Sequence, residues 1–341
     1  MKRLTQRIGV VGAGSWGSTL ANVLAGKGYP VDLWVFEEEL CRIIRETREN
    51  TYFLPGFRLN DHIQVSNDLK TVVKGHDLLL MVVPSHVYRP VAQQMLPFLK
   101  PGCHVVTATK GIENGTLLTM VGIWEELLEH KHAVELLCLA GPSFAREVIQ
   151  QIPTAITLAA SSIEVAQRVQ QILSTDYFRV YTSLDKVGVE IAGALKNVIA
   201  LAAGACDGLG FGHNTRAALI TRGLAEIARL GVRMGANPLT FSGLSGIGDL
   251  VLTCTGELSR NRTVGYQLGQ GKKIEDILKN MRMVAEGVKT TKSAHFLAQR
   301  LGVEMPITAQ VYHVLYEDKD PRIAVRDLMQ RDLKHELEHS T

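Results

Sequence analysis

The first 185 residues alternate short apolar runs with amphipathic stretches. Eight runs have the length and the β-branched composition of strands, and most of the segments between them space their apolar residues as helices do. This alternation predicts βα units around a mainly parallel, doubly wound sheet in an α/β fold. Residues 78–83 are apolar at every position, which predicts a central strand with helices on both faces. The predicted strands are 8–11, 31–35, 63–65, 78–83, 105–108, 134–139, 154–158 and 178–181.

After about residue 184 the pattern changes to helical spacing. Ala, Gly and Leu dominate this half, and we expect it to be all-helical. Since 341 residues exceed what one hydrophobic core usually serves, we divide the chain into two domains, 1–185 and 186–341. The predicted helices of the second domain are 187–205, 215–231, 262–269, 289–300 and 307–316.

Composition and charge exclude several classes of protein. With 46% hydrophobic and 21% charged residues the chain is ordinary globular protein, and its net charge of +3 has no basic runs to favour a nucleic acid partner. The five cysteines form no Cys-x-x-Cys pair, and no segment has the form of a signal peptide or of a membrane span. We therefore expect a cytoplasmic protein without a membrane span. Neither cysteines nor histidines show ligand spacing, so we expect no metal.

A glycine motif follows the first predicted strand directly and precedes a predicted helix. Gly12 permits the tight turn, Gly14 lets a pyrophosphate approach the backbone, and Gly17 permits close helix packing. Ser15 and Trp16 lie in the same turn, at a helix N-terminus that attracts phosphates. The motif predicts a dinucleotide site; the alternative is a glycine-rich turn without a ligand.

The choice between NAD and NADP is normally made at the end of the second strand. Glu37 and Glu38 lie where a ribose-binding acid would be, and the next arginine is Arg42. Carboxylates there would repel a 2′-phosphate, which favours NAD. The alternative is that these glutamates only open the next helix, where acidic residues are favoured.

Lys196 and Asn197 lie in the middle of a largely apolar predicted helix. A buried lysine is rare without a partner or a task, and burial lowers a lysine pKa toward the range useful in catalysis. The alternative is close helix packing, with Lys196 extending its ammonium outward. The positions on its face are all small and leave room beside the ammonium: Ala192, Gly193, Ala200 and Ala203.

Two loops and one glycine-rich stretch offer further candidates for a substrate site. Lys110, Gly141 and Ser143 each follow a predicted strand, at the edge of the sheet where ligands bind. In the other half, arginine with helix-terminal donors suits a phosphate. Each feature alone has an ordinary structural alternative, such as a surface lysine or a helix cap. The stretch in the second half contains Asp249, Thr253, Ser259, Arg260 and Asn261.

Taken together, these segments resemble the bacterial-type NAD(P)-dependent glycerol-3-phosphate dehydrogenase family. The matching words are GAGSWG, PSH at 84–86, ATKG, GPSFA, GALKN, GDLVLTC, SRNR, VAEG and EMPIT, in family order from about residue 8 to about residue 316. The resemblance implies a Rossmann domain that binds NAD or NADP, a helical substrate domain and a homodimer. It implies interconversion of dihydroxyacetone phosphate and sn-glycerol 3-phosphate, a phosphorylated small-molecule substrate, for phospholipid synthesis.

The same resemblance assigns residue roles. Lys196 becomes the general acid/base, Lys110 assists it, and Arg260 with Asn261 holds the phosphate. Many relatives carry a basic residue where this chain has Val35 and Phe36, which bears on the use of NADPH. Substrate contacts are implied for Lys110, Gly141, Ser143, Lys196, Asp249, Ser259, Arg260 and Asn261. Cofactor contacts are implied for Ser15, Trp16, Lys110, Ala145, Arg260, Val284 and Glu286, beside the glycines Gly12, Gly14 and Gly17.

Two rival interpretations remain at this stage. One is another two-domain reductase, of the ketopantoate or β-hydroxyacid type, which would have no need of the SRNR segment. The other is a nicotinamide-sensing binding protein without chemistry, in which Lys196 would be dispensable.

Overall fold

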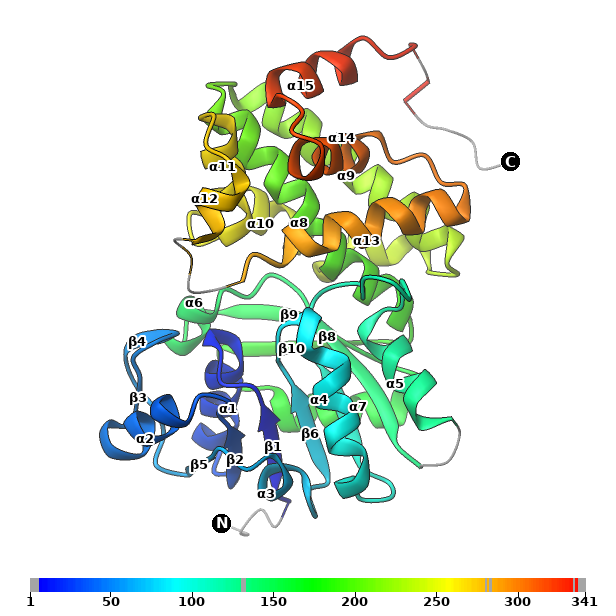
Figure 1. The fold of residues 1–341 in the computed structure, drawn as a ribbon. Helices are drawn as coiled ribbons and strands as arrows, with labels where there is room; N and C mark the ends of the chain where they lie inside the picture. The colour runs from blue at the N-terminus through cyan, green and yellow to red at the C-terminus, as the bar shows by residue number, and fades with distance from the viewer. Residues whose placement is uncertain (1–5, 130–132, 280, 282–283, 334, 337–341) are drawn as a thin grey trace.

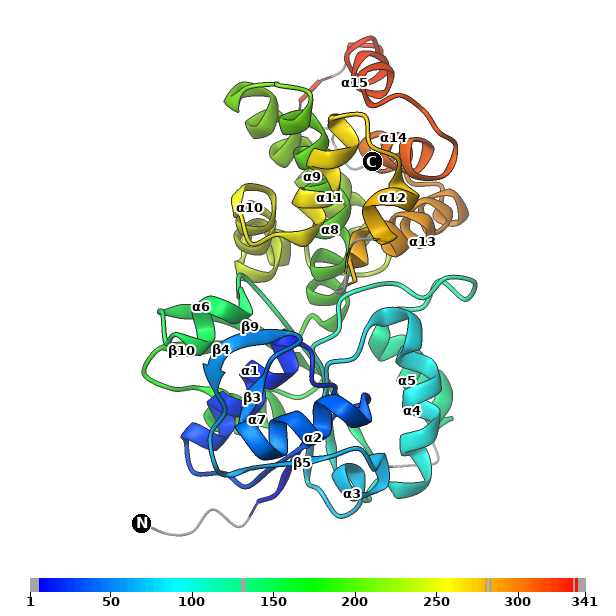
Figure 2. The same ribbon diagram turned by 60° about the vertical axis from the view of Figure 1, so that its left-hand side comes forward.

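The protein consists of a sheet half and a helical half, stacked one on the other (Figures 1 and 2). The structure is a computed structural model and describes residues 6–129, 133–279, 281, 284–333 and 335–336. Figure 1 shows the sheet half at one end of the molecule and the last helices at the opposite end. The fold class predicted from the sequence, a mainly parallel α/β sheet followed by a helical region, is confirmed.

One sheet of eight strands contains every strand predicted from the sequence. Its order is β10-β9-β8-β7-β6-β1-β2-β5, and all neighbours pair in parallel except β8 with β9. The apolar strand β6 lies between β1 and β7, in the interior of the sheet as predicted. A second, two-stranded sheet was not predicted. The strands are β1 Ile8–Val11, β2 Val31–Trp34, β3 Glu49–Asn50, β4 Leu54–Arg58, β5 Ile63–Ser66, β6 Leu78–Met81, β7 His104–Thr107, β8 Glu135–Ala140, β9 Thr154–Ala160 and β10 Phe178–Ser183.

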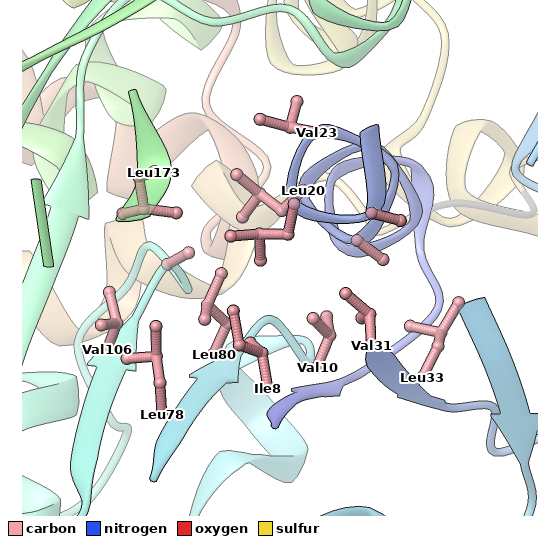
Figure 3. Packing of buried hydrophobic residues seen from close by; sticks show 14 of the residues in the cluster. Ile8, Val10, Leu20, Val23, Val31, Leu33, Leu78, Leu80, Val106 and Leu173 are labelled. Atoms are coloured by element: carbon pink, nitrogen blue, oxygen red, sulfur yellow. The ribbon is translucent and has the colours of Figure 1, made fainter. Parts of the chain in front are cut away.

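Helices cover both faces of the large sheet. On one face, Ile8, Val10 and Leu80 point toward Leu20 and other apolar residues of α1 (Figure 3). These side chains are fully buried, and burying each contributes about 1.5–3 kcal/mol. The helices of this half are α1 Ser15–Gly26, α2 Glu38–Thr47, α3 Leu69–Val73, α4 Tyr88–Met95, α5 Met120–Leu128, α6 Ala145–Ile149 and α7 Ile163–Leu173.

The second half is built around α8, which runs from the sheet half into the middle of the helical half (Figure 1). Helix α8 is long and apolar enough to cross a membrane, but 83% of its most apolar 18-residue segment is buried inside the protein. The five helices predicted for this half are present with slightly wider bounds, and α10, α12 and α15 were not predicted. The helices are α8 Lys186–Gly208, α9 His213–Arg233, α10 Asp249–Thr255, α11 Arg260–Gly269, α12 Ile274–Lys279, α13 Glu286–Leu301, α14 Pro306–Tyr316 and α15 Pro321–Met329.

Helices α8 and α11 meet backbone to backbone through glycines. A Cβ atom added at Gly204 of α8 would lie 2.0 Å from the Arg262 carbonyl oxygen, and one added at Gly265 of α11 would lie 2.0 Å from the Leu201 carbonyl oxygen. No Cβ atom fits at such distances, so only glycine permits this approach. The contact fixes the start of α11 relative to the middle of α8, where Lys196 lies.

We expect Gly265→Ala to destabilise the protein, because the added methyl group forces the two helices apart. Overpacking of this kind costs about 1–3 kcal/mol. Gly26→Ala is the matched control, since Gly26 also lies in a helix but an added Cβ meets no atom within 4 Å. Urea unfolding of the two variants and the parent measures the difference. A Gly265→Ala protein as stable as Gly26→Ala would contradict this account of the packing.

Candidate functional site

The glycine turn at residues 12–17 leaves its outer side open. Gly12 has φ +113°, and a Cβ added there would lie 2.8 Å from the Val82 carbonyl oxygen; one added at Gly17 would lie 1.8 Å from the Gly12 carbonyl oxygen. A Cβ at Gly14 would meet nothing within 4 Å. Gly14 is also the N-cap of α1 and provides no side chain to its first N–H groups. Gly12 and Gly17 are therefore required by internal packing. Gly14 faces space in which a pyrophosphate can meet the helix N-terminus.

The end of β2 presents an exposed aromatic ring beside acidic residues. The Asn67 side-chain amide donates to the carbonyl oxygens of Val35, at 3.0 Å, and Phe36, at 2.7 Å, which fixes this backbone. The Phe36 ring is 71% exposed and lies edge-on to Trp34. Glu37 is the N-cap residue of α2, but its side chain makes no capping hydrogen bond. Its carboxylate is therefore not held by capping of the helix.

A cluster of two lysines and one aspartate lies where the two halves meet. The Lys196 ammonium of α8 donates to Oδ1 of Asp249 and, at 2.9 Å, to the Thr253 hydroxyl. Lys110, from the loop after β7, donates to the other carboxylate oxygen of Asp249 at 3.0 Å. The Lys196 and Asp249 side chains are 8% and 1% exposed. The ammonium is thus held in place and does not extend into solvent.

The surroundings of this cluster shift its pKa values in opposite directions. Burial, assisted by the nearby charge of Lys110, lowers the pKa of Lys196 to about 7, although the Asp249 carboxylate opposes this shift. Burial alone would raise the pKa of Asp249, but the ammonium groups of Lys110 and Lys196 outweigh it and hold that pKa below its ordinary value. A lysine whose pKa lies near neutrality can give or take a proton at physiological pH.

The start of α11 places one arginine at the surface beside a network of buried amides. Ser259 is the N-cap and accepts the Arg262 N–H at 3.3 Å. The Asn261 side chain donates to the Asn197 side-chain oxygen and accepts the Gly287 N–H, both at 2.9 Å. The exposed Arg260 guanidinium donates one bond, to the Val284 carbonyl oxygen at 3.0 Å. A guanidinium at a helix N-terminus suits an anionic ligand.

The loop after β8 contains the other small residues predicted for the site. Gly141 has φ +147°, and a Cβ there would lie 2.8 Å from Cα of Ile156, so this position requires glycine for internal reasons. The Ser143 hydroxyl donates to the Gly141 carbonyl oxygen at 3.0 Å, and the Ala145 carbonyl oxygen accepts the Thr19 hydroxyl of α1. This segment is therefore attached to α1, the helix that follows the glycine turn.

Glu286, at the start of α13, joins the helical half directly to the sheet half. Both the N–H and the hydroxyl of Ser85 donate to its carboxylate. Burial raises the pKa of Glu286, while the bonds from Ser85 oppose the shift. Its hydrogen-bond partner is Ser85 of the sheet half, and the charges of Arg260 and Lys289 act on it from the helical half. Ser85 was overlooked, although its place just after β6, in the PSH segment, pointed to the ligand edge of the sheet.

Residues predicted separately thus lie around one junction. The sheet half contributes the predicted Lys110 and the overlooked Ser85, and the helical half contributes Lys196, Asp249 and Glu286. Thr253 was not predicted as a site residue. It lies four residues after Asp249 on α10, so the two side chains share one face of the helix, and this spacing could have identified it. Among the described residues, no group of three or more His, Cys, Asp or Glu side chains is arranged to hold a metal ion.

Comparison with known proteins places this chain in a family. Residues 7–166 match the model of the NAD-dependent glycerol-3-phosphate dehydrogenase N-terminus, and residues 185–326 match that of the C-terminus. The glycerol-3-phosphate dehydrogenase [NAD(P)+] of Syntrophobacter fumaroxidans is 71% identical over 97% of each chain.

Solved structures agree with the sequence relatives. A glycerol-3-phosphate dehydrogenase from Coxiella burnetii is 38% identical, with a TM-score of 0.91 over 96% of this chain and 99% of that one. A yeast glycerol-3-phosphate dehydrogenase is 28% identical, with a TM-score of 0.81 over 96% of this chain and 99% of that one. The geometry of the glycine turn and of the lysine cluster fits what these proteins are named for. The chain belongs to the NAD(P)-dependent glycerol-3-phosphate dehydrogenase family.

Proposed function

We propose that the chain interconverts dihydroxyacetone phosphate and sn-glycerol 3-phosphate with Lys196 as the general acid/base. Membership of the family supports the reaction, and the observation that carries the assignment of Lys196 is its buried ammonium, held by Asp249 and Thr253 at the junction of the two halves. A bound NAD(P) supplies or accepts the hydride. Lys196 protonates the carbonyl oxygen during reduction and takes the proton back during alcohol oxidation. Asp249 holds the ammonium in place, and burial, assisted by the charge of Lys110, lowers its pKa to about 7.

The cofactor and the substrate are bound by groups from both halves. Gly12, Gly14 and Gly17 with the N-terminus of α1 hold the pyrophosphate, and Arg260 with Asn261 holds the substrate phosphate. The further proposed cofactor contacts are Ser15, Trp16, Lys110, Ala145, Arg260, Val284 and Glu286. The further proposed substrate contacts are Lys110, Gly141, Ser143, Asp249 and Ser259.

We expect NADH to be used with a kcat/KM about five- to tenfold above that of NADPH. Glu37 and Glu38 lie where a 2′-phosphate would have to approach, and a repulsion of about 1–1.5 kcal/mol between exposed charges corresponds to that factor. Initial rates with both cofactors and dihydroxyacetone phosphate measure it. Phe36→Arg should raise the efficiency with NADPH, because the exposed ring gives way to a phosphate-binding cation. A higher efficiency with NADPH in the parent would remove the preference.

We expect the two directions of the reaction to respond oppositely to pH. Because burial lowers the pKa of Lys196 to about 7, the ammonium needed for reduction is lost as pH rises through that value. The kcat/KM for reduction should then fall about tenfold per pH unit, and that for oxidation should rise through the same midpoint. Initial rates between about pH 5.5 and pH 9.5 measure both profiles. Profiles that rise or fall together in the two directions would contradict the role of Lys196.

We further propose a cytoplasmic homodimer, divided near residue 185 into a cofactor domain and a substrate domain, that supplies sn-glycerol 3-phosphate for phospholipid synthesis. What supports the division is that β10 ends at Ser183 and α8 begins at Lys186. Light scattering on the purified protein tests the assembly against the chain mass of 37.4 kDa.

A further inference from the structure

A small cavity lies directly beneath the lysine cluster, between the ends of β7 and β8 and the first turns of α8. It offers room on the scale of a single ordered water molecule. Lys110, from the loop after β7, lines it together with Glu190 and Gly193 of α8. A Cβ added at Gly193 would lie 3.8 Å from Cγ of Lys110, so this glycine lets the lysine side chain run along the helix. The lining is formed by Thr107, Thr109, Lys110, Cys138, Leu139, Ala140, Val189, Glu190 and Gly193.

The cavity has the polar groups that an ordered water needs. Within the described part of the chain, the buried Thr107 hydroxyl has no hydrogen-bond partner of ordinary geometry, although the Tyr88 hydroxyl is its neighbour. The Thr109 hydroxyl donates to the Val83 carbonyl oxygen at 2.7 Å and keeps its lone pairs available. Together with Glu190 and Lys110 these groups provide the two to four partners that hold a buried water.

Glu190 connects this cavity to the surface of the sheet half. Its Oε1 accepts the Val121 N–H of α5 at 2.9 Å, and the Thr119 hydroxyl also bonds to the carboxylate. Burial raises the pKa of Glu190 to about 7, with Glu125 acting in the same direction and Lys186 opposing it. The residue as a whole is partly exposed, so solvent can reach it. The charged and titratable groups facing it are Lys110, Lys186, Glu125, Tyr88 and Cys138.

At the other end of the cavity, Lys110 reaches the catalytic ammonium. Both lysines bind Asp249, and their side chains are within hydrogen-bonding reach of each other. If Lys196 protonates the substrate, as proposed above, every reduction leaves it as a neutral amine that must regain a proton before the next turnover. Its side chain is 8% exposed, so direct exchange with solvent is hindered.

We propose that Glu190 is a positioning residue that delivers this proton to Lys196 through the cavity water and Lys110. After Lys196 has given its proton to the carbonyl oxygen, the Lys110 ammonium donates one to the Lys196 amine. The cavity water then gives a proton to the Lys110 amine and at the same time takes one from the Glu190 carboxylic acid. Solvent finally protonates the Glu190 carboxylate. Each turnover of reduction thus takes up one solvent proton and leaves every group as it began. The inference rests on the proposed function, since it requires Lys196 to be the proton donor.

The test is Glu190→Gln, which keeps an oxygen for the Val121 N–H but cannot carry the proton. We expect unchanged NADH affinity and an unchanged single-turnover rate from enzyme equilibrated near pH 6, where Lys196 begins protonated. The steady-state kcat for reduction should fall about tenfold at pH 8.5, with a larger solvent deuterium effect. Added imidazole, a small proton donor, should restore much of the loss.

The control is Glu164→Gln, an exposed carboxylate of α7 in the same half whose hydrogen-bond partner is Ser162; it should leave kcat unchanged. A Glu190→Gln enzyme with the parent's kcat and deuterium effect would overturn the relay. So would an equal loss in single-turnover and steady-state rates that imidazole does not restore, because that pattern indicates only a structural role. The parent is assayed alongside: failure of the parent to reduce dihydroxyacetone phosphate would refute the proposed function, and not the relay alone.

Discussion

Lys196→Met lowers kcat for dihydroxyacetone phosphate reduction by about 10²–10⁴-fold, the usual contribution of a general acid. Methionine nearly preserves the length and shape of the side chain but has no proton to give. The Asp249 carboxylate keeps its bond to Lys110, so the substitution does not leave that buried charge without a partner. The protein is therefore expected to fold and to bind NADH as the parent does.

Steady-state rates, with NADH fluorescence titration as the binding measurement, check this result. Lys273→Met is the control, because Lys273 is an exposed lysine of the same half and should not affect turnover. A Lys196→Met protein with the parent's turnover would mean that Lys196 is dispensable. The alternative of a nicotinamide-binding protein without chemistry would then be favoured.

Arg260→Ala should lower kcat/KM for dihydroxyacetone phosphate by about 10²–10³-fold, mainly through KM. Losing a charge-assisted, bidentate contact to a phosphate costs a few kcal/mol, and about 1.4 kcal/mol corresponds to each factor of ten. Among the described residues the exposed guanidinium gives one hydrogen bond, to the Val284 carbonyl oxygen, so its removal should disturb the fold little.

Dihydroxyacetone without the phosphate separates phosphate binding from other effects of this substitution. At saturating NADH, parent and Arg260→Ala should reduce it with similar, low efficiency, because dihydroxyacetone has no phosphate for residue 260 to bind. Arg322→Ala, an exposed arginine of α15, serves as the control and should match the parent with both substrates. Equal losses with the phosphorylated and the unphosphorylated compound would show that Arg260 does not bind the phosphate.

The sheet could be predicted from the sequence because its signals are local. Most of the eight strands are short apolar runs bounded by turn residues, and β6 is apolar throughout because helices cover both of its faces. The antiparallel pairing of β8 with β9 could not be predicted, since strand direction depends on how the chain returns after Gly141. The hairpin of β3 and β4 is too short and too exposed to leave an alternating pattern.

The site was predictable where chemistry conflicts with its surroundings. A lysine in the middle of an apolar helix needs a task or a partner, and that alone singled out Lys196. Its partners could not be deduced in the same way, because Asp249 is 53 residues away and Lys110 comes from the other half of the chain. The bond from Ser85 to Glu286, 201 residues apart, left no local signal either. Such pairs arise only from the packing of the two halves.

The most direct measurement is a crystal structure of the Lys196→Met protein with NADH and dihydroxyacetone phosphate bound. The account predicts the pyrophosphate on the turn of Gly12 to Gly17, the substrate phosphate on Arg260, and the carbonyl oxygen beside the end of residue 196. A substrate carbonyl that lies away from residue 196, or a phosphate bound far from Arg260, would contradict it.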